Sequence, residues 1–224
     1  IPIRKVPVKP QFEVDIDALI NACTQKTAII FLANPNNPTG RLVPPDEIIR
    51  LLDNIPDSTL LVLDEAYHEY TPPEMQLNLE KNLTKYPNLI ITRTFSKVYG
   101  LAALRLGYAF AHPDITALLY RIQLPFTVNQ AATVAALCAL KDHVFVQESI
   151  RINAEGLKQL KQGLTALGLS CLPSACNFIT FNCERNALEL DQHLQARGLI
   201  IRPLNPYDLT QHLRVTIGNF EQNA

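Results

Sequence analysis

Three apolar runs of strand length, each followed at once by a polar loop, are the feature that most constrains the fold of this chain. The runs cover residues 27–33, 59–63 and 89–92. A nearly unbroken apolar run of this length is typical of a strand buried on both faces of a parallel sheet. Helical spacing at residues 15–26 and 44–53 places a helix on each side of the first run. This alternation predicts an α/β fold with a largely parallel sheet.

The pattern changes after a fourth predicted strand, at residues 108–111. Long helical patterns come next, at residues 115–124, 129–140 and 144–167. Short strands around one further helix complete the chain, at residues 177–181, 187–197, 199–202 and 213–217. We therefore predict part of a large domain over residues 1–117 and a small α+β domain over residues 118–224, with the long helix connecting them.

Composition limits the class of partner. Of the 224 residues, 47% are hydrophobic, which is enough for a full core. The formal net charge is -1 with both signs interspersed, so we expect a small-molecule ligand, no nucleic acid and no membrane contact. The five cysteines show no C-x-x-C spacing, which predicts buried free thiols in a reducing, cytoplasmic compartment. The histidines show no pairing typical of metal ligands, and no metal site is expected.

The first residues indicate a longer parent chain. Residues 1–8 have the pattern of an edge strand that is entered from something upstream, and the sequence has no initiator methionine. We therefore expect the sequence to be truncated on its amino-terminal side.

Polar residues stand at the ends of the three predicted strands. Asn37, Asp64 and Lys97 each follow one apolar run, and Arg105 comes eight residues after Lys97. Taken singly, each has an ordinary alternative: Asn37 as a turn residue, Asp64 as a helix N-cap, Lys97 as a solvated loop cation and Arg105 as part of a surface ion pair. Ligands of open α/β sheets bind where the strands end, so the arrangement favours one shared site.

Four motifs around these residues resemble the successive motifs of the class I and II aminotransferases, the fold-type I pyridoxal-5'-phosphate enzymes. They are Asn-Pro-Asn-Asn-Pro-Thr-Gly at residues 34–40, Leu-Asp-Glu-Ala-Tyr at 63–67, Thr-Phe-Ser-Lys at 94–97 and Leu-Arg-Leu-Gly at 104–107. Within the family the resemblance is closest to the histidinol-phosphate aminotransferases. It implies transamination of L-histidinol phosphate with 2-oxoglutarate in histidine biosynthesis. Aromatic-amino-acid aminotransferases and threonine-phosphate decarboxylases share these motifs and remain alternatives.

The resemblance also implies roles for the residues at the strand ends. Lys97 matches the lysine that forms a Schiff base with the cofactor aldehyde and later carries a proton as general base and acid. Asp64 matches the carboxylate that pairs with the pyridine nitrogen, while Asn37 and Tyr67 match hydrogen-bond partners of the phenolic oxygen. These groups would orient the cofactor and tune its electronics.

Anion-binding roles follow from the same resemblance. Thr94, Ser96 and Arg105 match the cradle of the cofactor phosphate, since hydroxyls and a guanidinium are suited to phosphate oxygens. Arg214 and Arg202 match contacts to the carboxylate or phosphate of the substrate, with an internal salt bridge as the alternative for each.

Family members extend well beyond this chain on the amino-terminal side. The additional segment supplies backbone donors to the cofactor phosphate, an aromatic ring that stacks on the pyridine, and a tyrosine from the partner subunit of a homodimer. Without that segment, the alternative is a catalytically inert fragment or assembly module.

Overall fold

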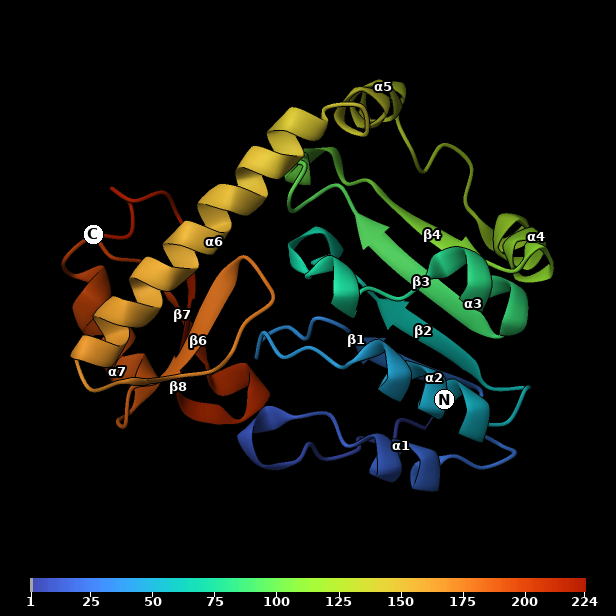
Figure 1. The fold of residues 1–224 in the computed structure, drawn as a ribbon, viewed down its shortest axis with the longest axis horizontal. Helices are drawn as coiled ribbons and strands as arrows, with labels where there is room; N and C mark the ends of the chain where they lie inside the picture. The colour runs from blue at the N-terminus through green and yellow to red at the C-terminus, as the bar shows by residue number, and fades with distance from the viewer. Residues whose placement is uncertain (1) are drawn as a thin grey trace.

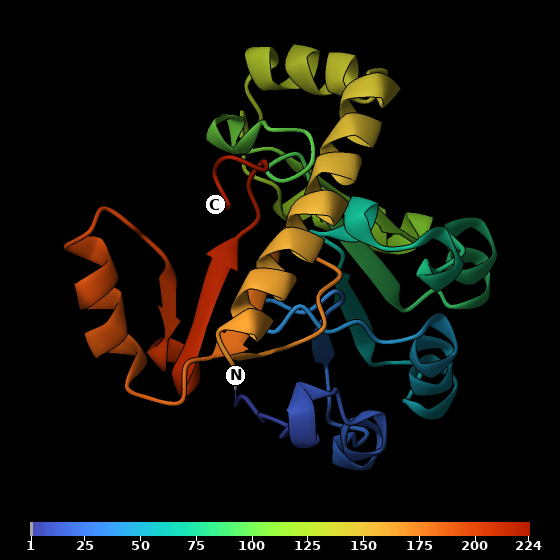
Figure 2. The same cartoon turned by 60° about the vertical axis from the view of Figure 1, so that its left-hand side comes forward.

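Two four-stranded sheets organise the computed structural model, which describes residues 2–224 apart from the side chains of residues 79 and 80 (Figure 1). The first sheet has the order β1-β2-β3-β4 and the second the order β5-β6-β8-β7. A long helix, α6 (His143–Ala166), contacts strands β5 and β6 of the second sheet and the short helix η2 that follows β2 (Figure 2). The chain therefore has one sheet in each half, with α6 in contact with both halves.

The first sheet brings the ends of its strands together. Strands β1 (Ile29–Ala33), β2 (Leu60–Asp64) and β3 (Leu89–Thr94) are parallel, as predicted, whereas β4 (Gly107–Ala111) runs antiparallel to β3. In this register Asp64 pairs with Ala33 on one side and with Thr92 on the other. The loops that follow the three parallel strands consequently start at one edge of the sheet.

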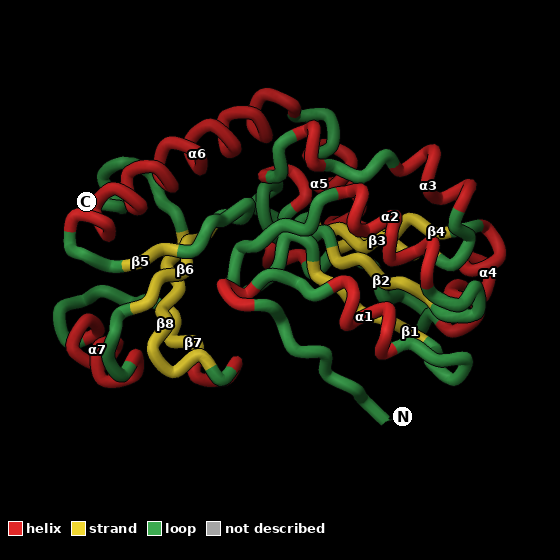
Figure 3. The backbone as a smooth tube through the Cα atoms, turned by 60° about the horizontal axis from the view of Figure 1, so that its bottom comes forward, coloured by secondary structure: helices red, strands yellow, loops and turns green. Residues whose placement is uncertain are grey.

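Helices cover one face of the first sheet, where the main core lies (Figure 3). The helices on this half are α1 (Ile16–Ala22), α2 (Pro45–Asn54) and α3 (Leu79–Lys85). Side chains of α1 and α2 pack with Leu61, Leu63 and Ile91, which are 0% exposed. Burial of this apolar surface provides the main driving force for the folding of this half of the chain. Helix α3 was not predicted, because its sequence is short and mostly polar.

The opposite face of β1 is not covered by this core. Ile30 and Leu32 are buried, but Ile29 and Phe31 are 44% and 76% exposed. The prediction that this strand is buried on both faces is therefore wrong, because the packed helices reach only the Ile30 side. The predicted edge strand is also wrong: residues 2–8 have no regular secondary structure, and Ile1 lies outside the described residues.

The sequence after β4 begins with helices and ends in the antiparallel second sheet. Its other helices are α4 (Pro113–Ile122), α5 (Gln130–Ala139) and α7 (Ala187–Gln195). Its strands are β5 (Ser170–Cys171), β6 (Phe178–Asn182), β7 (Arg202–Leu204) and β8 (Leu209–Thr216). The predicted boundary at residues 117 and 118 falls inside α4, and the division into two domains stays a prediction.

Short 3-10 helices occupy several of the connections. They are η1 (Pro10–Phe12), η2 (His68–Tyr70), η3 (Pro73–Met75), η4 (Ala102–Leu104) and η5 (Asn205–Tyr207). Two of them lie next to predicted site residues, since η2 follows Tyr67 and η4 precedes Arg105.

All five cysteines are free thiols. Cys176 and Cys183 are buried, but Cys138 is exposed on α5, so the prediction of burial is wrong for Cys138. The buried positions of α5 are Ala132 and Ala136, which places Cys138 on another side of the helix. Across residues 2–224, none of the helices has the length and apolar character needed to cross a membrane.

Candidate functional site

Asp64 presents its carboxylate at the strand ends of the first sheet. The side chain is exposed, and Oδ1 accepts a hydrogen bond of 3.0 Å from the backbone N–H of Ala66. The backbone around it is held by the neighbouring strands, because Asn34 N donates to Asp64 O and Glu65 N donates to Thr92 O, both at 2.9 Å. The carboxylate is therefore oriented by rigid backbone and remains accessible to a ligand.

Asn37 connects Tyr67 with Arg214, which come from distant parts of the sequence. Its Nδ2 donates to Tyr67 Oη at 3.3 Å, and its Oδ1 accepts a short hydrogen bond from Arg214 Nη1. Phe178 packs edge-on against the Tyr67 ring, with centroids 5.4 Å apart at 86°, and lies 4.9 Å from the Arg214 guanidinium carbon. One amide thus fixes a phenol and a guanidinium beside each other.

Tyr67 is buried in this arrangement, with 4% of its surface exposed. Burial raises the pKa of Tyr67 to about 12, and the nearby Cys176 and Asp64 also raise it, whereas Arg214 lowers it. The phenol is therefore protonated at neutral pH and carries a proton that it can donate.

This raised pKa predicts a loss of stability in alkali. The folded-state pKa of about 12 lies above the ordinary value of 10.0, so the contribution of the phenol is fully present below pH 10 and is lost as pH rises through about 12. We expect the free energy of unfolding of the Tyr67→Phe variant to fall less between about pH 9 and about pH 11 than that of the parent chain. Urea titrations at both pH values measure this change in the free energy of unfolding. Tyr120→Phe, which alters a 71% exposed ring, is the control, and equal losses in all three proteins would contradict the prediction.

Lys97 lies in the loop that follows β3. Its neighbours Phe95 and Val98 are 4% and 2% exposed, so they anchor the loop while Lys97 stays half-buried. Lys97 Nζ lies 5.2 Å from the centroid of the Tyr67 ring. Within residues 2–224, the ion pairs of side chains whose placement is described do not include Lys97. The ammonium group therefore has an aromatic neighbour and no carboxylate in direct contact.

Thr94, Ser96 and Arg105 form a second polar group at the same edge. Ser96 N donates to Thr94 Oγ1 at 3.1 Å, and Arg105 Nη1 lies 3.5 Å from Ser96 Oγ. Arg105 is exposed and adopts a left-handed conformation with φ 52°, while its Nη1 also donates to Ala102 O at 2.9 Å. Two hydroxyls and a guanidinium converge here, a donor set suited to phosphate oxygens.

Arg202 and Arg214 are neighbours on adjacent strands of the second sheet. They are direct partners in the antiparallel register of β7 and β8, so their side chains leave the sheet on the same face. Like charges placed directly opposite are destabilising. Neither arginine has a carboxylate within ion-pair distance among the described side chains. A bound anion between them would relieve this repulsion.

Sequence reasoning missed a buried ion pair behind the site. Glu65 is 4% exposed, accepts a hydrogen bond from Arg93 Nε at 2.9 Å and forms an ion pair with Arg93 Nη2 at 2.8 Å. His68 Nδ1 lies 3.2 Å from the same carboxylate. The sequence did contain a signal for this pair: Glu65 comes just after a predicted buried strand and needs a partner, and Arg93 directly follows the next predicted strand, residues 89–92.

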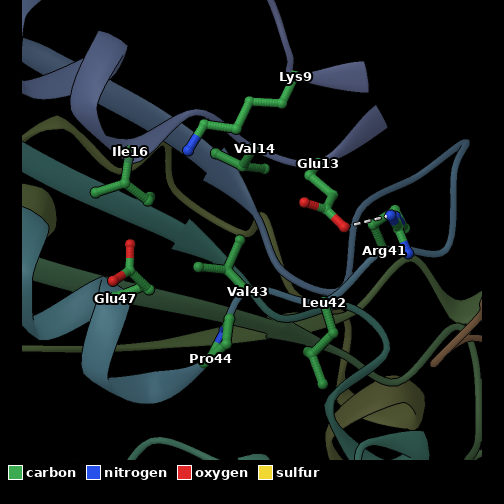
Figure 4. Close-up of a pocket in the computed structure, with 9 residues that line it drawn as sticks. All are labelled: Lys9, Glu13, Val14, Ile16, Arg41, Leu42, Val43, Pro44 and Glu47. Atoms are coloured by element: carbon green, nitrogen blue, oxygen red, sulfur yellow. Dashed lines mark hydrogen bonds and ion pairs between the residues drawn. The ribbon is translucent and has the colours of Figure 1, made fainter. Parts of the chain in front are cut away.

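Two surface hollows lie away from the predicted site residues. A pocket of about 300 Å³ beside α1 and α2 contains the ion pair of Arg41 and Glu13, whose charged atoms are 2.6 Å apart (Figure 4). Another, of about 340 Å³, lies along residues 120–128. Neither of these two hollows is lined by a predicted site residue.

Comparisons with known proteins identify the family and the fold of this chain. Residues 1–224 match the sequence model of the family described as aminotransferase class I and II. A histidinol-phosphate aminotransferase 2 of Legionella pneumophila (strain Lens) is 52% identical over 224 residues, which is 100% of this chain and 61% of the relative.

Two solved structures share the fold. Histidinol-phosphate aminotransferase from Sinorhizobium meliloti, in complex with pyridoxal-5'-phosphate, has a TM-score of 0.90 at 30% identity and covers 98% of this chain and 61% of its own. L-threonine-O-3-phosphate decarboxylase from Porphyromonas gingivalis has a TM-score of 0.73 at 26% identity, covering 89% and 62%. The predicted α/β fold class with a mostly parallel first sheet is confirmed.

The match extends over this whole chain but not over the whole of its relatives. The chain spans about three fifths of the length of the Legionella relative and of the Sinorhizobium structure. Since the family model matches every part of the sequence, the chain belongs to the class I and II aminotransferases.

Proposed function

We propose that this chain forms the cofactor and substrate site of a pyridoxal-phosphate-dependent aminotransferase that acts on L-histidinol phosphate and 2-oxoglutarate. The observation that carries the proposal is the convergence on Tyr67 of Asn37, Arg214 and Lys97. The substrate choice is supported by the names of the Legionella relative and the Sinorhizobium structure.

The residues present fit pyridoxal phosphate. Lys97 offers an amine without a carboxylate partner, Asp64 an exposed carboxylate, and Tyr67 with Asn37 a phenol and an amide donor. Arg105 and its neighbouring hydroxyls add an anion cradle. These groups match, in order, the aldehyde, the ring nitrogen, the phenolic oxygen and the phosphate of the cofactor.

Each residue has a distinct task in the proposed mechanism. When bound, pyridoxal phosphate supplies the electron sink for the reaction. Lys97 Nζ would hold the cofactor covalently and, once free, would move a proton at the substrate α-carbon as base and then acid. The Asp64 carboxylate would bind the protonated ring nitrogen, and Tyr67 Oη and Asn37 Nδ2 would donate to the phenolic oxygen.

The paired arginines bind the anionic ends of the substrates. Arg214 is held in place by Asn37 and lies over Phe178, while Arg202 stands directly opposite on β7. A guanidinium binds carboxylate or phosphate through two parallel N–H donors. Two such groups on one face suit both the phosphate of histidinol phosphate and the carboxylates of 2-oxoglutarate.

Absorbance tests the cofactor assignment. The chain mixed with pyridoxal phosphate is expected to develop a visible absorbance band that borohydride removes, leaving the cofactor attached to the peptide that contains Lys97. No band and no adduct would identify this chain as an inert fragment. Turnover of histidinol phosphate, phenylalanine and threonine phosphate by the loaded protein then tests the substrate, and activity with either of the last two but not the first would reject histidinol phosphate.

Asp64→Asn tests the assignment of the ring-nitrogen partner. The variant keeps the size of the side chain and the hydrogen bond from Ala66, but it removes the negative charge. We expect kcat to fall by about 10²-fold to 10³-fold, the range typical for the loss of one electrostatic contact to the reacting group. Single-turnover kinetics measures the effect. Asp57→Asn, in an exposed turn, is the control, and an unchanged kcat at residue 64 would rule out this role.

We further propose a cytoplasmic homodimer. The free thiols support a reducing compartment. Apolar side chains are exposed along α4 and after it, with Tyr120 71%, Ile122 76% and Phe126 100% exposed, and such a surface favours burial against a partner. Sedimentation velocity tests the assembly, and a monomer at micromolar concentration would contradict it.

A further inference from the structure

We propose that Thr180 is a positioning residue for Asn37, and through Asn37 for Arg214 and Tyr67. The inference rests on the proposed function, since it assigns to Thr180 the task of holding the amide that contacts the substrate arginine and the phenol. Thr180 lies on β6 in the second sheet, whereas Asn37 belongs to the loop after β1 in the first. A side chain of one sheet would thereby set the geometry of a site built largely on the other.

The loop of residues 34–40 is braced internally at its base. The Asn34 side chain accepts from Val43 N at 2.7 Å and donates to Val43 O at 3.1 Å. Asn36 N donates to Arg41 O, and Gly40 N donates to Asn36 O, both at 2.7 Å. Thr39 Oγ1 also donates to Asn36 Oδ1 at 2.9 Å and closes the turn over Asn37 and Pro38. These bonds fix the shape of the loop, but its position against the second sheet depends on contacts from that sheet.

Thr180 supplies one of these contacts. Its Oγ1 donates to Pro38 O at 2.6 Å, and the threonine is 0% exposed. A hydroxyl buried without a partner is costly, so this hydrogen bond is strongly favoured in the folded chain. Pro38 directly follows Asn37, and fixing its carbonyl therefore fixes the peptide from which the Asn37 side chain projects.

The sheet register makes the contact specific. Thr180 is the direct partner of Arg214 in the antiparallel pairing of β6 and β8, so both side chains lie on one face. Neighbouring positions of the sheet thus hold neighbouring residues of the loop: Thr180 binds the Pro38 carbonyl and Arg214 binds the Asn37 amide. The distance between the loop tip and the guanidinium is set by the threonine.

Close packing at Gly40 keeps the rest of the loop against the same sheet. Ala175 N donates to Gly40 O at 2.9 Å. Gly40 has φ +79°, and a Cβ at this position would lie 2.5 Å from Ser174 Oγ, so only glycine fits. The contact at Gly40 is a backbone hydrogen bond, whereas the contact at the loop tip comes from the Thr180 side chain. A substitution at Thr180 can therefore remove the second contact alone.

Three variants test the assignment in the cofactor-free chain. Thr180→Val keeps the shape and removes the hydroxyl, Thr180→Ala removes it with less bulk, and Thr180→Ser retains it. The readout is the nitrogen-15 NMR signal of the Asn37 side-chain amide, whose donor and acceptor contacts a displaced tip would change. We expect the valine and alanine variants to shift this signal and the serine variant to leave it near its parent position. The Asn186 amide, at the N-cap of α7, is the internal reference.

The loaded protein provides a second readout. We expect Thr180→Val to raise KM for 2-oxoglutarate about tenfold, which corresponds to about 1.4 kcal/mol of binding free energy. We expect a smaller fall in kcat, because Asn37 and Tyr67 also contact the cofactor whereas Lys97 is not held by this loop. Thr180→Ser is expected to restore KM, and Thr210→Val on the exposed part of β8 to leave it unchanged.

The two readouts separate the inference from the proposed function. An Asn37 signal that stays unchanged in the valine and alanine variants, or a serine variant that behaves like them, would overturn the role of Thr180. A parent chain that never acquires the cofactor band would reject the proposed function, while the NMR comparison would still decide whether Thr180 positions Asn37.

Discussion

Replacing Lys97 by alanine is expected to abolish covalent attachment of pyridoxal phosphate and to reduce transamination by about 10⁴-fold. The amine is both the anchor of the cofactor and the group that moves the proton, and a positioned acid or base alone contributes about 10²-fold to 10⁴-fold. The fold should survive, because Lys97 is half-buried and its buried neighbours Phe95 and Val98 anchor the loop. Borohydride trapping followed by peptide mass analysis measures attachment, and initial rates measure turnover.

The control is Lys141→Ala, which removes an exposed lysine between α5 and α6. It should retain the visible band, the adduct and the rate of the parent protein. A Lys97→Ala protein that still forms a borohydride-stable adduct at another lysine, with a near-normal rate, would show that the chemistry is centred elsewhere. Unfolding curves of both variants verify that a lost rate does not come from a lost fold.

Arg93→Ala is expected to cost the fold about 3–5 kcal/mol of its free energy of unfolding, because it leaves the buried Glu65 carboxylate without its guanidinium partner. The two side chains are 11% and 5% exposed and are joined by contacts of 2.8 and 2.9 Å. The pair connects β3 with the segment after β2, directly behind Asp64. Urea unfolding followed by circular dichroism measures the loss.

A comparison with an exposed ion pair tests whether burial causes the loss of stability expected for Arg93→Ala. Arg151→Ala removes another arginine with ion pairs of 2.6 Å, to Glu148 and Glu155, but these groups are more than half exposed. Solvent screening weakens such pairs, so little change is expected there. Removing both charges behind the site, with Arg93→Met and Glu65→Leu together, should be less destabilising than Arg93→Ala alone. A double variant less stable than the single one would contradict the account based on an unpaired buried charge.

The elements of the first sheet could be predicted because buried strands carry their own signal. The three apolar runs became β1, β2 and β3 within one or two residues at each end. The direction of β4 was not predicted. Residues 95–106 hold only the short helix η4, and a parallel return would have needed a longer crossover, so the antiparallel direction was inferable from this loop.

The sequence pattern could not predict which strand faces are exposed or which distant segments are in contact. The run 27–33 is apolar throughout, but periodicity does not tell which faces have a neighbour, and Phe31 proved exposed. Helix α3 depends on packing of Leu83 against the core rather than on propensity.

For the site, the motifs brought Asn37, Tyr67, Lys97 and Arg214 to attention, and the structure places these four together. The contact from Thr180 to Pro38 crosses 142 positions of sequence and carries no local signal. The roles predicted for these four residues stay predictions, as do those predicted for Asp64, Thr94, Ser96, Arg105 and Arg202.

The exposed face of β1 has a consequence for handling the protein. Strand β1 is an edge of its sheet, pairing only with β2 among the described strands, and its sequence Ile-Ile-Phe-Leu-Ala has no charge and no proline. An uncharged apolar edge of this kind is a template for intermolecular strand addition and fibril-like aggregation. The strand that ends in the Asn37 loop is thus also the segment most prone to misassembly. The exposed Phe31 side chain is therefore expected to lower the solubility of the chain, and a charged residue at that position should raise it.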